Sequence, residues 1–174
     1  MSACPTTTPS RWRNSPPCVR WTPWQPPYHL FRLGIEAEIL PYTIEHNIGV
    51  LPYSPLASGM LTGRFDENTT FEDTDWRSRA TAFTGEAFRR NLAVVRELEE
   101  FAAERDITVS QLAIARVLAQ PGVHVAIVGA RSSANIEASA QATDVDLSAD
   151  DLARIDTIVA DGVPIEGATP EGVL

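Results

Sequence analysis

Lysine is absent from this chain of 174 residues, so all 14 of its basic residues are arginines. Without a side-chain amine, the chain excludes mechanisms that form a Schiff base on lysine or use lysine to tune the pKa of a neighbour. The arginines are outnumbered by 23 acidic residues, which leaves a formal charge of −9 at pH 7. Because nucleic acids and anionic membranes bind to clustered positive charge, we expect neither as a partner.

Long apolar runs and cysteines are also scarce. No run approaches the roughly 20 apolar residues of a transmembrane helix, and the N-terminus lacks the apolar core of a signal peptide. We therefore expect one soluble domain in the cytoplasm. The two cysteines, Cys4 and Cys18, are expected to be free thiols without a function.

Residues 1–24 differ in composition from the rest of the chain. They contain five of the 13 prolines and three arginines but no acidic residue. Repeated proline interrupts helices and central strands, and no apolar periodicity runs through the segment. We expect residues 1–24 to be disordered or poorly packed.

Regular patterns begin at Gln25. Apolar residues from Ile35 to Ile44 predict a helix that ends at Asn47–Gly49 and is kinked by Pro41. A buried strand at Val50–Tyr53 leads into a loop through Gly59 and Gly63. The remaining pattern predicts an irregular stretch at 64–85, a helix over Phe88–Ala102, a helix from the Thr108/Gln111 capping box to Leu118, a strand at Val123–Val128, and helices opening near Ser132 and at Ser148.

This alternation of strands and helices predicts an α/β fold with a parallel sheet. Including a strand near Gln25–Leu30, about three strands are visible, whereas a closed (β/α)₈ barrel has eight. We therefore expect a partial parallel sheet with helices on one side and an exposed opposite side. Pro52 would remove one hydrogen-bond donor from the second strand and loosen it.

Four motifs, in this order and at these separations, resemble the aldo-keto reductases: QPPYHLFR at 25–32, YSPLASGMLTGRF at 53–65, DWR at 75–77 and IVGARS at 127–132. The resemblance extends from residue 25 to about residue 172 and covers only the C-terminal half of that family. It implies a partial (β/α)₈ TIM barrel made of about the last three strand–helix units, with residues 25–174 forming this half-barrel.

The resemblance also implies NADP(H)-dependent carbonyl reduction by hydride transfer. In this family the residue that matches Gln25 hydrogen-bonds the nicotinamide carboxamide, and the aromatic that matches Tyr53 stacks on the nicotinamide ring. The loop that wraps the pyrophosphate is matched by Ser54, Leu56, Ser58 and Gly59. From the residues alone, the alternative for Tyr53 is an aromatic packed in the core, and a loop of this kind is more often a plain connection.

The last motif corresponds to the adenosine end of the cofactor, matched by Ile127, Gly129, Arg131, Ser132 and Asn135. Arg131 would contact the 2′-phosphate and favour NADP(H), although an exposed arginine is often only solvated. The family usually continues with Glu and Asn, and Ala138 and Ser139 replace them here. We therefore expect NADP(H) to bind weakly.

The family's catalytic tyrosine, lysine, aspartate and histidine all lie in the first half of its barrel. The lysine has no counterpart in this chain, and none of the three histidines matches the catalytic one. We expect His46 to complement a helix C-terminus, and His29 and His124 to be ordinary surface or packing residues. We assign no catalytic residue and no metal site, and expect no carbonyl reduction by this chain alone.

Two alternatives remain open for such a half-barrel: a non-catalytic nucleotide-binding module, or a protein that assembles with another chain through exposed strand edges. A complete small enzyme would need a nucleophile–base pair or a metal cluster, and no such pattern is present. The N-terminal segment has its own explanation. Read two bases later with suitable synonymous codons, the nucleotides for Met1–Trp24 can encode VSLPNYDTLALAQLAAVRPVDTL, which resembles the family's fifth strand and helix and indicates a frameshift before Gln25.

Overall fold

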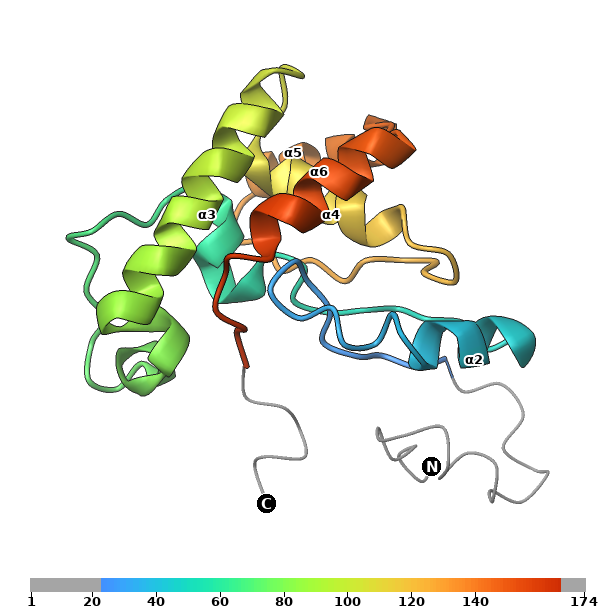
Figure 1. Ribbon diagram of the computed structural model, residues 1–174, viewed down its shortest axis with the longest axis horizontal. Coiled ribbons are helices and arrows are strands. Elements are labelled where there is room, and N and C mark those ends of the chain that lie inside the picture. The colour runs from blue at the N-terminus through green and yellow to red at the C-terminus, as the bar shows by residue number, and fades with distance from the viewer. Residues whose placement is uncertain (1–22, 167–174) are drawn as a thin grey trace.

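The computed structural model describes residues 23–166 (Figure 1). Residues 1–22 of the predicted disordered or frameshifted segment, with both cysteines, lie outside this range, and the expectations for them remain predictions. At Trp24 the prediction of poor packing is wrong, because this side chain is buried and its residue pairs with Val50. The elements are α2 (Ile39–Glu45), η1 (Ala57–Thr62), η2 (Trp76–Arg79), η3 (Thr81–Phe83), α3 (Gly85–Ala103), α4 (Val109–Leu118), α5 (Ser133–Ala140), η4 (Gln141–Asp144) and α6 (Ala149–Val159), where η marks a 3₁₀ helix.

Three extended segments run parallel to one another, with residues 50–53 between residues 24–27 and residues 123–127. Val50 pairs with Trp24 on one side and with Val123 on the other, and Tyr53 pairs with Pro27 and Ile127 in the same way. These segments match the three predicted strands in position, order and direction. Helices α3, α4 and α6 lie together on one side of them (Figure 1).

The pairing differs from the expected sheet, because within residues 23–166 the segments meet in isolated bridges and not in continuous strands. Prolines explain much of the difference, since proline has no N–H to donate to a ladder. Pro26 and Pro27 occupy the first segment and Pro52 the second. The third segment also has one extra residue between its two bridges, at Val123 and Ile127, compared with the second segment, where the bridges are at Val50 and Tyr53. A β-bulge has the same effect.

Pro52 makes the contact between the second and third segments one-sided. The two backbone hydrogen bonds across it, from His124 N to Val50 O at 3.0 Å and from Ile127 N to Pro52 O at 2.8 Å, are both donated by the third segment. The N–H of Val50 donates to the ring Nδ1 of His124 at 3.4 Å. The loss of one backbone donor predicted from Pro52 is therefore present in the structure, and the loosening of the strand remains a prediction.

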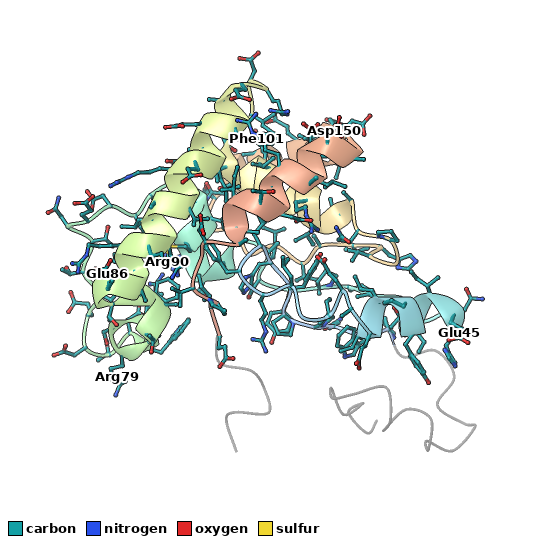
Figure 2. All side chains as sticks on the ribbon, in the orientation of Figure 1. Glu45, Arg79, Glu86, Arg90, Phe101 and Asp150 are labelled. Carbon is teal, nitrogen blue, oxygen red and sulfur yellow. The ribbon has the colours of Figure 1, made fainter. Side chains whose placement is uncertain are left out.

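The main apolar core lies between α3, α4, α6 and η1. The predicted stripe on α3 is confirmed, because all five of its residues are buried: Phe88, Leu92, Val95, Leu98 and Ala102. Charged residues of α3 and α6, including Glu86, Arg90 and Asp150, point outward (Figure 2). Phe101, which is fully buried, lies on the side of α3 that faces α6.

Side-chain caps define where three of the helices begin, as the sequence predicts. Thr108 and Gln111 form a reciprocal capping box at α4, and Ser148 forms another with Asp151 at α6. Ser132 caps α5 by accepting from the N–H of Asn135. Such caps satisfy backbone donors that have no partner within the helix.

Helix α2 begins later than predicted, at Ile39 instead of Ile35, and residues 34–38 form turns. The kink predicted at Pro41 is also wrong. A proline ring would clash with the preceding turn in a helix interior but fits the first turn. Because the helix begins at Ile39, Pro41 lies in that first turn. His46 caps the C-terminal end as predicted, with its ring nitrogen 2.9 Å from the carbonyl oxygen of Tyr42.

A buried charged network joins the first segment to the helices. The side chain of Arg116 on α4 is only 2% exposed. Its guanidinium donates to Asp156 on α6 at 2.7 Å and to Glu36 and the Tyr28 hydroxyl at 3.2 Å. The Tyr28 hydroxyl in turn donates to Glu36 at 2.5 Å. Burial, followed by the bond to Glu36, raises the pKa of Tyr28 far above its ordinary value.

The third segment and α5 both carry exposed apolar side chains. Val125 and Ile127 on the third segment are 49% and 39% exposed, and Ile136 on α5 is 60% exposed. Among residues 23–166, no helix combines the length and the apolar character needed to span a bilayer.

Candidate functional site

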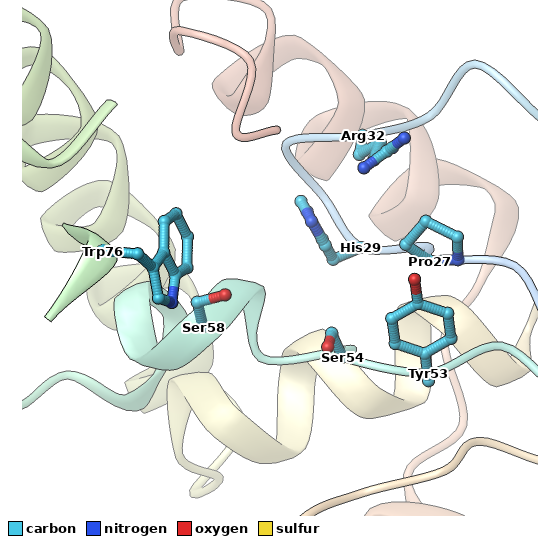
Figure 3. Close-up of a pocket in the computed structure, with 7 residues that line it drawn as sticks. All are labelled: Pro27, His29, Arg32, Tyr53, Ser54, Ser58 and Trp76. Carbon is cyan, nitrogen blue, oxygen red and sulfur yellow. The ribbon is translucent and has the colours of Figure 1, made fainter. Parts of the chain in front are cut away.

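A pocket opens at the carboxyl ends of the first two extended segments (Figure 3). Residues from four parts of the chain line it: Pro27 at the end of the first segment with His29 and Arg32 after it, Tyr53 and Ser54 at the end of the second, Ser58 on η1, and Trp76 on η2. The carboxyl ends of parallel strands are where α/β folds usually form ligand sites. The geometry of the chain therefore places this pocket where a ligand is expected.

His29 and Arg32 are positioned by a tight turn. The N–H of Arg32 donates to the carbonyl oxygen of His29 at 2.7 Å, and the two residues form an antiparallel bridge. His29 is only 4% exposed, and its Nδ1 has no hydrogen-bond partner among the described residues. Burial, followed by the charge of Arg32, lowers the pKa of His29 to about 4. The ring is therefore neutral at pH 7.

The loop after Tyr53 has an unusual backbone. Ser54, Ala57 and Ser58 all have positive φ values, of 59°, 48° and 55°. This left-handed conformation is strained for residues other than glycine, and such strain is concentrated at functional sites. The N–H groups of Ala57 and Gly59 donate within the loop, to the carbonyl oxygens of Ser54 and Leu56. Ser54 and Ser58 are the two residues of this loop that line the pocket, and the N–H groups of Ala57 and Gly59 are already used within the loop.

Gly59 is required by the packing of the loop itself. Its φ of 99° is one that L-residues rarely adopt. A Cβ at this position would lie 3.0 Å from the ring of Phe65 and 3.5 Å from the guanidinium of Arg77. The glycine therefore allows Phe65 and Arg77 to approach the loop closely.

Arg77, which is paired with Asp75, binds the backbone of this loop at Ser58. Asp75 caps η2 by accepting from the N–H of Arg77 at 3.0 Å, and it also binds the Arg77 guanidinium at 2.5 Å. The same guanidinium donates to the carbonyl oxygen of Ser58 at 3.0 Å and lies 4.5 Å from the ring centre of Phe71. The bond from Arg77 is the main reason that the pKa of Asp75 lies below its ordinary value.

The structure brings together part of the predicted cofactor site. Tyr53, Ser54 and Ser58 share the pocket, and Ile127 pairs with Tyr53 across the bridge. Gln25 is exposed on the first segment and does not line this pocket. Leu56 is half-buried and packs against the main core.

The predicted adenosine-end residues lie apart from the pocket lining. Gly129 and Arg131 are exposed between the third segment and α5. Ser132 is the N-cap of α5, and its hydroxyl accepts from the N–H of the half-buried Asn135 at 3.3 Å. The N-terminus of α5 is a suitable place for an anion, because helix N–H groups without partners point outward there.

Four pocket residues were not assigned to the site from the sequence: Pro27, His29, Arg32 and Trp76. Arg32 is the last residue of the QPPYHLFR motif, and Trp76 is the middle residue of DWR. Both residues therefore belong to motifs that were recognised, but the motifs did not indicate that these side chains line a pocket. His29 was predicted to be a surface or packing residue, and its burial agrees with packing. Its place in the pocket depends on the turn to Arg32, which the sequence pattern did not predict.

Parallel segments, the helices packed on them and a pocket at the carboxyl ends of two of the segments define an α/β protein with a candidate ligand site. The aldo/keto reductase family profile matches residues 15–160, and the chain belongs to the aldo/keto reductase family. The match begins before Gln25, the first residue of the motifs quoted above.

Individual relatives agree with this assignment. An aldo-keto reductase of Bacillus subtilis is 37% identical over 136 residues, covering 78% of this chain and 41% of the relative. An NADP(+) aldo-keto reductase of Schizosaccharomyces pombe is 33% identical over 124 residues, covering 70% of this chain and 36% of the relative. The chain thus spans about two-fifths of the length of these curated relatives.

A solved structure is similar to the whole described fold. The glycerol dehydrogenase of Gluconobacter oxydans superimposes with a TM-score of 0.76 at 36% sequence identity, over 84% of this chain and 44% of that protein. The three extended segments and their helices therefore have the arrangement found in part of an aldo-keto reductase.

Proposed function

We propose that this chain is the nucleotide-binding half of an NADP(H)-dependent aldo-keto reductase, that it binds NADP(H) weakly, and that it does not reduce carbonyl compounds on its own. In this proposal the three extended segments correspond to the last three strand–helix units of a (β/α)₈ barrel. The observation that carries the proposal is that Tyr53, Ser54 and Ser58 line one pocket at the carboxyl ends of parallel segments.

The residues present fit parts of such a cofactor. The Tyr53 ring offers a flat surface for the nicotinamide, and the hydroxyls of Ser54 and Ser58 would face the pyrophosphate. Gln25 would hold the carboxamide. The exposed Arg131 beside the N-terminus of α5 would bind the 2′-phosphate. The NADP(+) specificity in the name of the Schizosaccharomyces pombe relative supports the choice of NADP(H).

The absence of reduction follows from the lack of a tuned proton donor. When bound, NADPH supplies a hydride, but the carbonyl oxygen must also receive a proton. A positioned general acid typically contributes about 10²- to 10⁴-fold to the rate. This chain has no lysine to tune a tyrosine for that role, and His29 is neutral in its buried position.

The alternative is a half-barrel that assembles with another chain, a second copy included, and one observation favours it. Val125 and Ile127 leave apolar side chains exposed on the third segment, which pairs with the second segment on one side. An unpaired edge of this kind favours pairing with another strand. Sedimentation of the chain over a range of concentrations would show whether this edge is used.

The cofactor proposal is tested by titrating NADPH and NADH into the full chain and into Tyr53→Ala, Arg131→Ala and the control Arg64→Ala. We expect Tyr53→Ala to weaken both nucleotides and Arg131→Ala to weaken NADPH selectively. Arg64 is exposed and does not line the pocket, so its removal changes neither affinity. NADPH oxidation with a panel of aldehydes should not exceed the blank. Steady turnover, or NADPH affinity that is unaffected by both site variants, would contradict the proposal.

A further inference from the structure

The pocket is positively charged although the chain as a whole is strongly acidic. Arg32 is the one charged residue among the seven that line it at neutral pH, and no carboxylate lines it. The formal charge of the chain is −9. A cation without a nearby carboxylate, in a concave site, attracts small anions more effectively than an exposed arginine. Arg32 and His29 are not among the residues assigned above to the cofactor, although Tyr53, Ser54 and Ser58 line the same pocket.

The neighbouring charges do not cancel this effect. Arg77 donates to the carbonyl oxygen of Ser58, and its charge is compensated by the carboxylate of Asp75. His29 adds no charge at pH 7, because its pKa is about 4. Among the described residues, Arg32 forms no ion pair within 4.0 Å that would occupy its guanidinium.

His29 provides the second observation. Its side chain is almost completely buried, it lines the pocket, and its Nδ1 has no partner in the described part of the chain. A buried polar atom without a hydrogen bond usually costs about 1 to 3 kcal/mol, so native proteins rarely retain one without a reason. Nδ1 itself is enclosed and out of reach of a ligand, but the other ring nitrogen, Nε2, can carry the proton of the neutral imidazole and donate one hydrogen bond to an oxygen in the pocket.

The turn at His29–Arg32 places both groups on one wall. Residues paired in an antiparallel bridge carry their side chains on the same side, and Figure 3 shows both side chains at the pocket. The opposite side of the pocket is formed by the Trp76 ring and the Ser58 hydroxyl. Tyr53, the proposed nicotinamide platform, lies at the end nearest Pro27.

We propose that Arg32 and His29 form an anion subsite that binds the carboxylate or phosphate group of a small carbonyl compound beside the nicotinamide position. Arg32 supplies the charge and a forked set of donors, His29 supplies a fixed N–H donor, and Trp76 covers the carbon skeleton. This inference rests on the proposed function for the place of the nicotinamide. The substrates of the complete enzyme would then be anionic aldehydes or ketones.

The experiment uses the full chain with inorganic phosphate and acetate as probes, and with NADPH as a separate ligand. Binding is measured by calorimetry for the unaltered chain, Arg32→Gln, His29→Phe and the control Arg64→Gln. Arg64→Gln removes the same charge at an exposed position outside the pocket. The ring signals of His29 are followed by NMR as the pH is varied, with and without phosphate.

We expect Arg32→Gln to weaken phosphate and acetate about tenfold or more, the usual effect of losing a charged hydrogen-bond partner, and to leave NADPH affinity unchanged. His29→Phe should weaken both anions, and phosphate should raise the pKa of His29 in the unaltered chain. Arg64→Gln should match the unaltered chain throughout. If His29→Phe does not fold, Arg32→Gln and the NMR titration still decide the result.

The subsite is overturned if the unaltered chain binds neither anion, or if Arg32→Gln and Arg64→Gln bind them equally. It is also overturned if NADPH displaces phosphate, because the phosphate would then occupy the site of a nucleotide phosphate group. Failure of the proposed function is distinguishable. In that case NADPH would not bind, whereas phosphate binding would still depend on Arg32.

Discussion

The guanidinium of Arg77 donates to the carbonyl oxygen of Ser58 at 3.0 Å and thereby ties the DWR motif to the loop after Tyr53. Asp75 fixes the guanidinium from the other side. Ser58 is one of the residues held at positive φ, so the bond from Arg77 is made to a strained part of the loop. The two motifs therefore form one structural unit, although they are separated in the sequence.

We expect Arg77→Gln to loosen this loop. The variant loses a charged hydrogen bond to Ser58 and the contact with the Phe71 ring, and the free energy of unfolding should fall by about 2 kcal/mol. The pKa of Asp75 should return toward its ordinary value. Urea denaturation and NMR titration measure the two effects. Arg79→Gln is the control, because Arg79 is an exposed residue of the same 3₁₀ helix, η2. An equal loss of stability in the two variants would contradict the role given to Arg77.

Arg116 is predicted to be the most sensitive charged residue in the described fold. Arg116→Met preserves much of the side-chain volume but leaves Glu36 and Asp156 without their shared partner. Loss of one member of a buried charged network costs about 3 to 5 kcal/mol, and the partial exposure of both carboxylates places the expected loss near the lower value. Denaturant unfolding measures it.

The matched control for this prediction is Arg154→Met on α6. Arg154 also pairs with a carboxylate, that of Glu104, but at an exposed position. Exposed ion pairs contribute little to stability. A similar loss of stability in both variants would show that burial of the Arg116 network is not the cause.

The buried His29 should make stability depend on pH. Its pKa falls from 6.5 to about 4 on folding, so between these values the unfolded chain binds more protons than the folded chain. Stability is therefore complete above about pH 6.5 and is lost as the pH falls toward 4, by about 2 to 3.5 kcal/mol in total. His29→Phe removes this dependence, whereas the exposed carboxylates titrate in both proteins. If the free energy of unfolding changes with pH between about 4 and 6.5 in the same way for the unaltered chain and for His29→Phe, the role given to His29 is wrong.

Gly59→Ala tests the packing of the loop. Alanine at a φ of 99° is strained, and its Cβ would press on the Phe65 ring, so we expect a loss of about 1 to 3 kcal/mol. Gly34→Ala is the control, because a Cβ there meets nothing within 4 Å. Thermal unfolding of the two variants distinguishes strain at Gly59 from a general effect of removing glycine.

Local sequence signals predicted most elements of the fold. The capping box at Thr108, the cap at Ser148 and the stripe on α3 depend on neighbours along the chain, and these predictions are confirmed. The start of α2 was predicted wrongly, because apolar spacing alone did not account for the place that a proline can occupy in a helix.

The candidate site was less accessible to sequence reasoning. Tyr53, Ser54 and Ser58 were found because they belong to one contiguous motif, and their role as cofactor ligands remains a prediction. The contribution of Arg32 and Trp76 to the same pocket depends on a turn and on η2, which bring distant parts of the chain together. Arg116 was missed because its three partners lie in three different parts of the sequence.

Because Pro52 has no N–H, amide hydrogen exchange can distinguish separation of the third segment from separation of the first. Exchange of the amide hydrogens of His124 and Ile127 reports on the contact between the second and third segments, because those two residues donate both of its backbone hydrogen bonds. The amides of Leu51 and Tyr53 donate to Trp24 and Pro26 and report on the other contact. The two contacts thus have separate sets of exchangeable hydrogens, and release of the third segment would leave the protection of Leu51 and Tyr53 intact.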